Sequence, residues 1–503
     1  MKKFFYLSTL LLVMLATLLP MNVKAQADVW DGSAAQWTQG SGTQADPYLI
    51  ETAENLAWIA EMVNSGVTTY AGVYFKLASD LDMNSIAWVP IGNSTTQLFC
   101  GKFDGDNHFI DSISIAGSYS YSGLFGITGD GFCCRNLGVN TNSLYYRPTY
   151  CGGIVGYVRG ANTIIEHCYQ LGFLITGIYV GGLVGYNESA GTQILSCHNI
   201  GFCNATGGTG ENYHYSGGII AYSYSTIDIY NSYNAGRISS SSSTTTAWSD
   251  SYSHSGGIAG GGGSCINILN CYNIGTISSS ASASHSTSSA YAYSGGITGK
   301  NGNSSSLVKN CYNTGTLTGI ECGGIIANGY YSSVTNCYYL DTCGGTVAGG
   351  TSKTEAQMKS SSFPVILNSD SVVFVMDDHN VNQGYPIFGD EIYVVSEDAT
   401  NITFNSATLN GTYSGNVDIK GFRYKETTDT VFNTVYCSLN APYNYSISGL
   451  TEGTTYQYQY FVRKNGVSYY GDTKTFSTIS CDVSLNITMP TDAVCVEIGR
   501  AHV

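Results

Sequence analysis

A glycine motif with seven copies, six of them a Gly-Gly doublet, is the feature that most constrains the fold of this chain. In one clear copy the run GGIVGY begins at Gly152, and the run IEHCYQLG follows from Ile165. The marker glycine stands at Gly123, where Ser122 precedes it, and is the second glycine of the doublet at Gly153, Gly182, Gly218, Gly257, Gly296 and Gly324, in steps of 30, 29, 36, 39, 39 and 28 residues. Steps of this length are typical of solenoids, in which every repeat forms one coil. We therefore predict a solenoid as the main body of the chain.

A small residue recurs 13 to 15 residues after six of these doublets. The positions are Cys168, Cys197, Ser232, Cys271, Cys311 and Cys337. The exchange of cysteine for Ser232 favours small buried side chains that stack along the interior, because free cysteine behaves as a small hydrophobe. Sixteen cysteines in an exported chain would also fit a disulfide framework. We predict that these six positions stack in register and that most of the thiols in this ladder are reduced.

Zinc is the sharper alternative for the cysteines, at His167-Cys168 or Cys197-His198. Neighbours on a strand point to opposite faces, so neither pair can chelate from one side. We therefore expect no metal and no other cofactor. In the same strands the run NCYN repeats at Asn270 and Asn310. Asparagine amides and tyrosine rings are therefore expected to stack from rung to rung, about 4.8 Å apart.

The start of the chain resembles a secretory signal. Residues 1–25 contain Lys2-Lys3, an apolar run and the small-residue cleavage site Val23-Lys24-Ala25. No cysteine occurs before Cys100 and no later apolar run is long enough to span a membrane, so we expect neither a lipid anchor nor membrane insertion. A net charge of −15 argues against nucleic acid as a partner. The protein is expected to be secreted or attached to the bacterial cell surface.

A single amphipathic helix is predicted ahead of the repeats. Apolar residues at Leu56, Ile59, Ala60 and Val63 have helical spacing, Thr52 can cap the start, and Gly66 can end the helix. A solenoid needs such an element, because its first rung would otherwise expose the core and an unpaired strand edge. We assign residues 28–118 to this cap and the first coils.

Several sequence runs before and within the repeats resemble a known protein family. The runs DPYLIETAENLAWIA, YFKLASDLDMN, WVPIG and GKFDGDNHFI, followed by GLFG at Gly123, resemble the GLUG-repeat proteins, which are exported bacterial surface or adhesin-like molecules. The similarity spans roughly residues 30 to 340. It implies a right-handed parallel β-solenoid, with the GLUG-type repeats at 119–341.

The remainder of the chain has a different pattern. Residues 342–390 are predicted as a C-terminal cap and linker with a short helix at Thr354–Lys359. Alternating strands in 391–478 predict an all-β sandwich that resembles a fibronectin type III domain, in which Tyr456 would be the corner tyrosine that bonds back to the preceding backbone. Residues 479–496 are expected to start a further, truncated segment. The final EIGRAHV, 497–503, matches the translation of a sequencing adapter, so we expect the true C-terminus to lie beyond it.

The enzyme alternative was weighed because β-solenoids also host polysaccharide lyases and glycosidases. The carboxylate pairs Asp80/Asp82 and Asp104/Asp106 sit in Asp/Asn/Gly turns, where such side chains bond to local backbone. Basic residues are few and scattered between 120 and 340, and neither HExxH nor GxSxG occurs. We therefore expect no catalytic residues and no enzymatic activity.

Tyrosine is the positive functional signal, with 40 copies in the chain. Several are expected in extruded loops or beside the glycine corners: Tyr119, Tyr121, Tyr145, Tyr146, Tyr150, Tyr213, Tyr215, Tyr330 and Tyr331. We weighed exposed rings that stack on a ligand against rings that stack along the solenoid. The long serine-rich segments Ser239–Ser255 and Ser278–Ser294 look like flexible loops, and their aromatic residues Trp248, Tyr252, Tyr291 and Tyr293 are the candidate contacts. The predicted function is adhesion to, or binding of, glycans or surface proteins. The alternatives are a carbohydrate-active enzyme or a spacer for a missing C-terminal domain.

Overall fold

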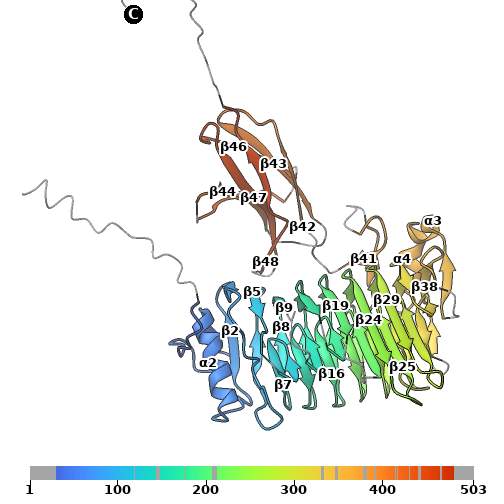
Figure 1. Ribbon diagram of the computed structural model, residues 1–503. Coiled ribbons are helices and arrows are strands. Elements are labelled where there is room, and N and C mark those ends of the chain that lie inside the picture. Colours follow the sequence, from blue (N-terminus) through green and yellow to red (C-terminus); the bar gives the residue numbers. More distant parts are fainter. Residues whose placement is uncertain are drawn as a thin grey trace, which may run out of the picture. The chain divides into compact units, whose positions relative to one another are not determined.

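The structure is a computed structural model (Figure 1). It describes residues 30–480, apart from 118, 143–147, 176, 207–211, 330–332, 346–348, 378–381, 390–391, 393, 414, 416, 418, 430, 440–442 and 465–466. The predicted signal peptide and residues 481–503 lie outside this description. The chain divides into two compact units: the first runs up to Asp377 and includes Gly384–Gly389, and the second continues from Asp390.

The first unit is a parallel β-solenoid, as predicted. Every coil passes through up to five sheets, which we number I to V in chain order. Sheet I comprises β1 (Tyr48–Ile50), β2 (Tyr74–Leu77), β4 (Lys102–Asp104), β8 (Cys133–Arg135), β12 (Ile164–Glu166), β17 (Thr192–Leu195), β22 (Ile227–Tyr230), β27 (Ile266–Leu269), β32 (Leu307–Lys309) and β37 (Ser333–Thr335). Sheet II comprises β3 (Leu81–Asp82), β5 (Phe109–Ser114), β9 (Gly138–Asn142), β13 (Tyr169–Gln170), β18 (His198–Asn199), β23 (Tyr233–Asn234), β28 (Tyr272–Asn273), β33 (Tyr312–Asn313), β38 (Tyr338–Leu340) and β39 (Thr351–Lys353).

The other three sheets complete each coil. Sheet III comprises β14 (Phe173–Ile175), β19 (Phe202–Thr206), β24 (Ile238–Thr244), β29 (Ile277–Ala283) and β34 (Leu317–Thr318). Sheet IV comprises β6 (Tyr121–Ser122), β10 (Tyr150–Gly152), β15 (Tyr179–Gly181), β20 (Tyr213–Gly217), β25 (Ser251–Gly256), β30 (Ala290–Gly295) and β35 (Glu321–Gly323). Sheet V comprises β7 (Phe125–Thr128), β11 (Val155–Val158), β16 (Val184–Asn187), β21 (Ile220–Ser223), β26 (Ala259–Gly262), β31 (Thr298–Lys300) and β36 (Ile326–Asn328).

Two apolar cores lie inside the coil. The larger core is enclosed by sheets I, II and V and contains side chains such as Ile165, Cys168 and Val155. The smaller core lies between sheets III and IV, which face each other, and contains Leu174 and Val180. The coil is therefore a main body with a two-layered projection, and we call sheets III and IV together the flange.

A ladder of buried amides separates the two cores. Gln170, Asn199, Asn234, Asn273 and Asn313 are completely buried on successive rungs. Each Nδ2 group from Asn199 to Asn273 donates to the Oδ1 atom of the next asparagine at 2.7 to 2.8 Å. A second, outer asparagine ladder joins Asn231, Asn270, Asn310 and Asn336. The predicted amide stacking is therefore confirmed.

The glycine doublet occupies a sharp corner between sheets IV and V. A Cβ atom on Gly256 would lie 1.9 Å from the carbonyl oxygen of Ala259, and one on Gly257 would lie 2.6 Å from Cβ of Asn273. Neither glycine has a positive φ. The doublet is therefore required by close approach of backbone and amide ladder to the corner, rather than by an unusual backbone conformation.

The ladder of small residues stacks in register, as predicted. The residue that follows each member pairs directly with its equivalent on the next rung, from Tyr169 with His198 to Tyr312 with Tyr338. The backbone amide of Cys197 donates to Ser232 Oγ at 3.1 Å, and that of Cys168 approaches Cys197 Sγ at 3.4 Å. His198 points outward and stacks between Tyr169 and Tyr233, away from Cys197. No group of three or more potential metal ligands occurs in the part of the chain that the structure describes.

The cysteines are expected to remain thiols, because packing accounts for their positions. Burial raises the pKa of Cys311 and Cys337 well above the usual thiol range, which keeps them protonated and unreactive. Of the described cysteines only Cys100, Cys265 and Cys437 are partly exposed. Ellman's reagent should therefore label few thiols in the native protein and release the remainder on unfolding in urea without reductant. Unchanged labelling after unfolding would contradict this prediction.

The N-terminal helix α2 (Ala53–Asn64) is present as predicted. Thr52 caps it by accepting a hydrogen bond from Asn55 N, and Gly66 follows the helix end with a φ of +76°. Leu56, Ile59 and Val63 are buried in the main core. The helix covers the apolar interior at the start of the solenoid (Figure 1).

The two serine-rich segments are not flexible loops, so this prediction is wrong. They form β24, β25, β29 and β30, which extend the two layers of the flange and pair in register over six or seven residues. Serine side chains fill the space between the layers. Ser240 Oγ lies 2.6 Å from Ser253 Oγ, and Ser242 Oγ lies 2.7 Å from Ser251 Oγ. The serine-rich composition suggested loops, but strands whose inward side chains are serine can still pair and pack.

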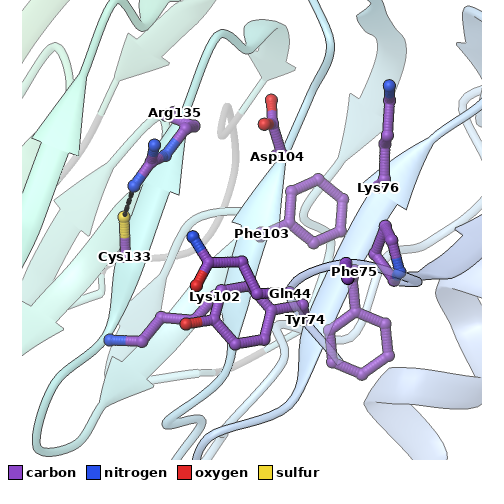
Figure 2. A pocket seen from close by; sticks show the side chains of 11 residues that line it. Gln44, Tyr74, Phe75, Lys76, Lys102, Phe103, Asp104, Cys133 and Arg135 are labelled. Atoms are coloured by element: carbon purple, nitrogen blue, oxygen red, sulfur yellow. Dashed lines mark hydrogen bonds between the residues drawn. The ribbon is translucent and has the colours of Figure 1, made fainter. Parts of the chain in front are cut away.

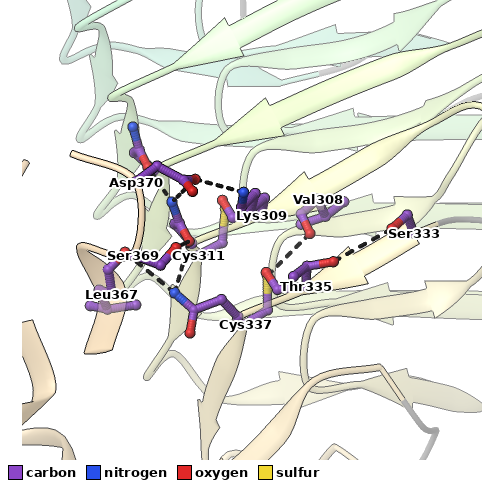
Figure 3. Close-up of polar contacts among 12 residues, drawn as sticks. Val308, Lys309, Cys311, Ser333, Thr335, Cys337, Leu367, Ser369 and Asp370 are labelled. Atoms are coloured by element: carbon purple, nitrogen blue, oxygen red, sulfur yellow. Dashed lines mark hydrogen bonds and ion pairs between the residues drawn. The ribbon is translucent and has the colours of Figure 1, made fainter. Parts of the chain in front are cut away.

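The segment after the last coil packs against the outer face of sheet II. It contains α3 (Glu355–Met358), α4 (Ser362–Leu367), β40 (Phe374–Val375) and β41 (Ile387–Phe388). Phe374 and Phe388 pack on the stacked rings of Tyr272 and its neighbours. Figure 3 shows polar contacts at the same place: Asp370 Oδ2 accepts from Lys309 Nζ at 2.6 Å, and Asn336 donates to the carbonyl oxygen of Leu367 at 3.4 Å. This segment therefore covers the side of the last coils.

The second unit is an antiparallel β-sandwich, as predicted. One sheet joins β42 (Val394–Thr400), β43 (Ser406–Tyr413) and β46 (Asn444–Ser448). The other joins β44 (Ile419–Glu426), β45 (Asn433–Cys437), β47 (Thr455–Lys464), β48 (Val467–Tyr470) and β49 (Lys474–Ser477). Leu409, Phe422 and Tyr460 lie in the core between them. The hydroxyl of Tyr456 accepts a hydrogen bond from Thr451 N at 2.8 Å, which confirms the predicted corner bond.

Candidate functional site: the aromatic face of sheets IV and V

A continuous row of aromatic rings follows the outer side of sheet IV. Tyr121, Tyr150, Tyr179, Tyr215, His254 and Tyr293 occupy one register position on successive rungs. Adjacent rings are nearly parallel, with centroids 4.8 to 5.6 Å apart. These distances match the rung spacing, so the row is a direct consequence of the repeat. We call it the inner row.

A second row stands opposite on sheet V. Tyr157, Tyr186 and Tyr222 pair in register on β11, β16 and β21. Their rings meet those of sheet IV edge to face: Tyr150 and Tyr157 have centroids 4.9 Å apart at 62°, and Tyr215 and Tyr222 are 4.7 Å apart at 63°. Outward side chains of adjoining strands can meet in this way only if the corner between the sheets is re-entrant. The glycine corner therefore brings two tyrosine rows together on the outside of the coil.

A third, shorter row lies farther out on the flange. Tyr213, Tyr252 and Tyr291 stack with centroids 4.7 and 4.9 Å apart. We call this the outer row, and the three rows together the aromatic face. The predicted contact residues are distributed over it: Tyr252 and Tyr291 belong to the outer row and Tyr293 to the inner row, where it is buried. Trp248 is 84% exposed at the tip between β24 and β25, and it belongs to none of the three rows.

The aromatic face has few charges. Glu188 accepts a hydrogen bond from Tyr157 Oη at 2.8 Å, and Asp250 accepts one from Tyr252 Oη at 3.2 Å. Burial, aided by Asp250, raises the pKa of Tyr252 to about 12, and burial with Glu188 raises the pKa of Tyr157 further. These phenols therefore stay protonated at neutral pH and can both donate and accept hydrogen bonds.

Sequence reasoning placed the aromatic signal correctly in part. It identified Tyr121, Tyr150 and Tyr215 as lying beside the glycine corners, but the opposing row on sheet V was missed. The signal was present as the recurring tyrosine four residues after the doublet, in GGIVGY and GGLVGY. Tyr145, Tyr146, Tyr330 and Tyr331 lie outside the described residues. Stacking along the solenoid is confirmed for these rows, whereas a role of the rings in ligand binding stays a prediction.

A charged cleft on the outer side of sheet I is the other candidate site (Figure 2). It has a volume of about 370 Å³ and is lined by Lys76, Lys102, Asp104, Cys133 and Arg135, with the loop at Gln44–Pro47 on one side. Two of its bases precede residue 120, so the sequence search for basic residues among the repeats did not find them.

Charges in this cleft compensate one another. Lys76, Asp104, Arg135 and Glu166 follow one another in register across β2, β4, β8 and β12. Lys76 Nζ lies 3.0 Å from Asp106 Oδ2, Lys102 donates to the carbonyl oxygen of Gly131, and Arg135 Nη2 lies 3.4 Å from Cys133 Sγ. Alternating charge across neighbouring strands stabilises a sheet without any ligand. The cleft is therefore accounted for by ion pairing.

Of the carboxylate pairs weighed for catalysis, Asp82 and Asp104 end strands β3 and β4, Asp80 lies just before β3, and Asp106 lies in the turn after β4. Asp104 Oδ1 accepts hydrogen bonds from Asp106 N at 2.9 Å and from Asn136 Nδ2 at 3.0 Å. Asp80 Oδ1 accepts from Phe109 N at 3.0 Å, and Asp82 Oδ1 accepts from Asn84 N at 2.8 Å. Asp82 and Asp104 thus bond to local backbone, as predicted, whereas Asp80 bonds to the backbone of the next rung and Asp106 pairs with Lys76.

Comparisons with known proteins give the following similarities. No family model matches the chain. A protein of Evansella cellulosilytica named "Putative Gly-rich membrane protein" is 28% identical over 141 residues, which cover 27% of this chain and 15% of that protein. The chain thus matches only a small part of its curated relative. In the described residues, no helix has the length and apolar character needed to cross a membrane.

Two solved structures are similar to this chain at low identity and with low TM-scores. A "putative immunoglobulin A1 protease from Bacteroides ovatus" is 22% identical, with a TM-score of 0.43, over 70% of this chain and 95% of that one. The sensor domain of the anti-sigma factor RsgI4 of Pseudobacteroides cellulosolvens, in a short form, is 19% identical with a TM-score of 0.15, over 18% of this chain and 95% of that domain.

Proposed function

We propose that this chain is an exported bacterial surface protein that binds an extended glycan along its aromatic face and has no enzymatic activity. The observation that supports this proposal is the pair of tyrosine rows that meet at the re-entrant corner. Their rings are fixed by stacking at 4.8 to 5.6 Å, so little conformational entropy is lost when a ligand binds.

The chemistry of the rows suits a glycan. Interior rings of a stack have both faces covered by their neighbours, so they present edges and hydroxyl groups outward. A row of phenols at rung spacing offers donors and acceptors in a line, which matches the many hydroxyl groups of a polysaccharide chain. Tyrosine also supplies apolar contact area beside each hydroxyl group.

The enzyme alternative receives less support from the charged groups. Asp82 and Asp104 accept local backbone hydrogen bonds, and Asp80 accepts one from Phe109 N of the next rung. In the charged cleft, Lys76 pairs with a carboxylate and Lys102 donates to a carbonyl oxygen. A general base needs a free lone pair and a reachable substrate proton. We therefore expect no release of reducing ends or unsaturated products from plant or host glycans.

Serine substitutions in both rows test the proposed function. The triple variant Tyr150→Ser, Tyr157→Ser, Tyr186→Ser removes rings from both walls of the corner, and we expect roughly 30-fold weaker binding to glycans selected on an array. The matched control is Tyr230→Ser, on the outer side of sheet I. A triple Tyr→Phe variant at the same positions keeps ring packing and should lose about ten-fold through the missing hydroxyl groups.

Circular dichroism and thermal unfolding separate binding loss from misfolding in these variants. If both triple variants fold and bind glycan as tightly as the wild type, the proposal is contradicted. The β-sandwich would then be the candidate binding unit. Absence of any glycan or mucin binding by the wild type would favour the spacer alternative.

A further inference from the structure

Tyr213 is the most exposed ring of the aromatic face, because the other rings of the three rows are buried or half-buried. Within the inner row each ring from Tyr150 to His254 has a parallel aromatic neighbour on both sides. Tyr252 is likewise enclosed by Tyr213 and Tyr291. Ligands can therefore reach only the edges of these interior rings.

Tyr213 begins the outer row and has only one aromatic neighbour among the described residues. Tyr179 pairs with Tyr215, no residue of β15 pairs with Tyr213, and Gly177 bridges Thr206 of sheet III. At that rung the flange is shorter, because β15 starts at Tyr179 whereas β20 starts at Tyr213. The flange thus has a step there.

Exposure agrees with this geometry. Tyr213 is 47% exposed, whereas Tyr215, two residues along the same strand, is 4% exposed. Its parallel contact with Tyr252, at 4.7 Å and 2°, holds one face and leaves the other toward the step. A fixed aromatic face beside hydroxyl groups is the arrangement that suits the apolar C–H face of a pyranose ring, since the sugar hydroxyl groups then lie at the ring edge.

Charge on the aromatic face selects among sugars. Among the described residues, Glu188, Asp250 and Glu321 bring three carboxylates to its strands and adjoining turns, and Lys300 and Arg159 bring two cationic groups. The whole chain carries a net charge of −15. An acidic polysaccharide would meet repulsion over this surface, whereas a neutral one would not.

We infer that the step at Tyr213 is a sugar subsite, at which a pyranose ring of a neutral glycan stacks on the open face of Tyr213 while the chain continues along the tyrosine hydroxyl groups. The inference rests on the proposed function and deepens it by naming the ligand class and the residue that holds the ring.

The test compares three full-length variants with the wild type. The probes are neutral galactan, mannan and β-glucan oligosaccharides, with polygalacturonate and chondroitin sulfate as acidic counterparts, measured by biolayer interferometry. Tyr213→Ala removes the stacking face and should weaken binding of the neutral probe at least ten-fold. Tyr213→Phe keeps the face and should bind within about three-fold of the wild type. Tyr230→Ala, on the outer side of sheet I and outside the aromatic face, is the matched control and should bind like the wild type.

Saturation-transfer NMR adds a readout that a purely structural role would not change. Irradiation of aromatic protons should saturate the C–H protons on one face of the bound sugar in the wild type and in Tyr213→Phe, but not in Tyr213→Ala. If Tyr213→Ala binds like the wild type while the triple serine variant does not, the subsite is refuted and the proposed function stands. Binding of the acidic probes alone would refute the neutral class. Failure of the wild type to bind any probe would refute the subsite together with glycan binding.

Discussion

Replacing Gly256 with alanine is expected to destabilise the solenoid by about 3 kcal/mol or more, because the new methyl group has no room. Its Cβ atom would lie 1.9 Å from the carbonyl oxygen of Ala259 and 2.7 Å from the amide nitrogen of Gly299. Both atoms belong to backbone in paired strands, so relief requires separation of sheets IV and V rather than rotation of a side chain. Equivalent crowding at Gly217, Gly295 and Gly323 shows that every rung depends on this corner.

Gly263 in the same coil provides the matched control. A Cβ atom there would approach only the end of the Tyr222 side chain, at 2.9 Å from its hydroxyl oxygen, and Gly263 is exposed. Gly263→Ala should therefore change stability by no more than about 0.5 kcal/mol. Urea unfolding followed by circular dichroism measures the free energy of unfolding of both variants. Equal stability of Gly256→Ala and Gly263→Ala would show that the corner can open at little cost.

Acid is expected to destabilise the protein through His254, and a tyrosine at this position should remove that effect. His254 is 2% exposed between Tyr215 and Tyr293 in the inner row. Burial, together with the positive charge of Lys300, lowers its pKa to about 3. In the unfolded chain the same group takes up a proton below about pH 6.5. The unfolded state therefore binds more protons between pH 6.5 and 3, so stability falls as the pH falls through this window.

His254→Tyr continues the tyrosine row and has no such proton uptake. Between pH 7 and pH 4.5 the wild type should lose about 2 to 3 kcal/mol more than the variant, from the difference between the two pKa values. His285→Gln is the control, because His285 is exposed at the tip of the flange. Thermal or urea unfolding at both pH values measures the difference. A variant that loses as much stability in acid as the wild type would show that His254 is protonated in the folded protein.

Sequence alone was sufficient where one rung repeats another. The constant interval from doublet to ladder position predicted in-register stacking of Cys168, Cys197 and Ser232, and the structure confirms it. The solenoid, the helix α2 with its Thr52 cap, and the corner bond of Tyr456 were predicted as well. These features depend on local chemistry or on strict repetition, both of which can be read along the chain.

Only the tertiary structure showed which conformation the segment of variable length after each ladder position adopts. Serine-rich stretches such as Ser239–Ser255 look like solvated loops in sequence, but pairing with the next rung turns them into strands whose serines bond across the flange. The candidate site depended on the same step. Tyr150 and Tyr157 are seven residues apart and belong to different sheets, and only the crowded glycine corner brings their rings within 4.9 Å. Sequence determined the repeat and its period, whereas the angle between sheets IV and V, which is set by backbone packing across rungs, determined which repeated residues meet.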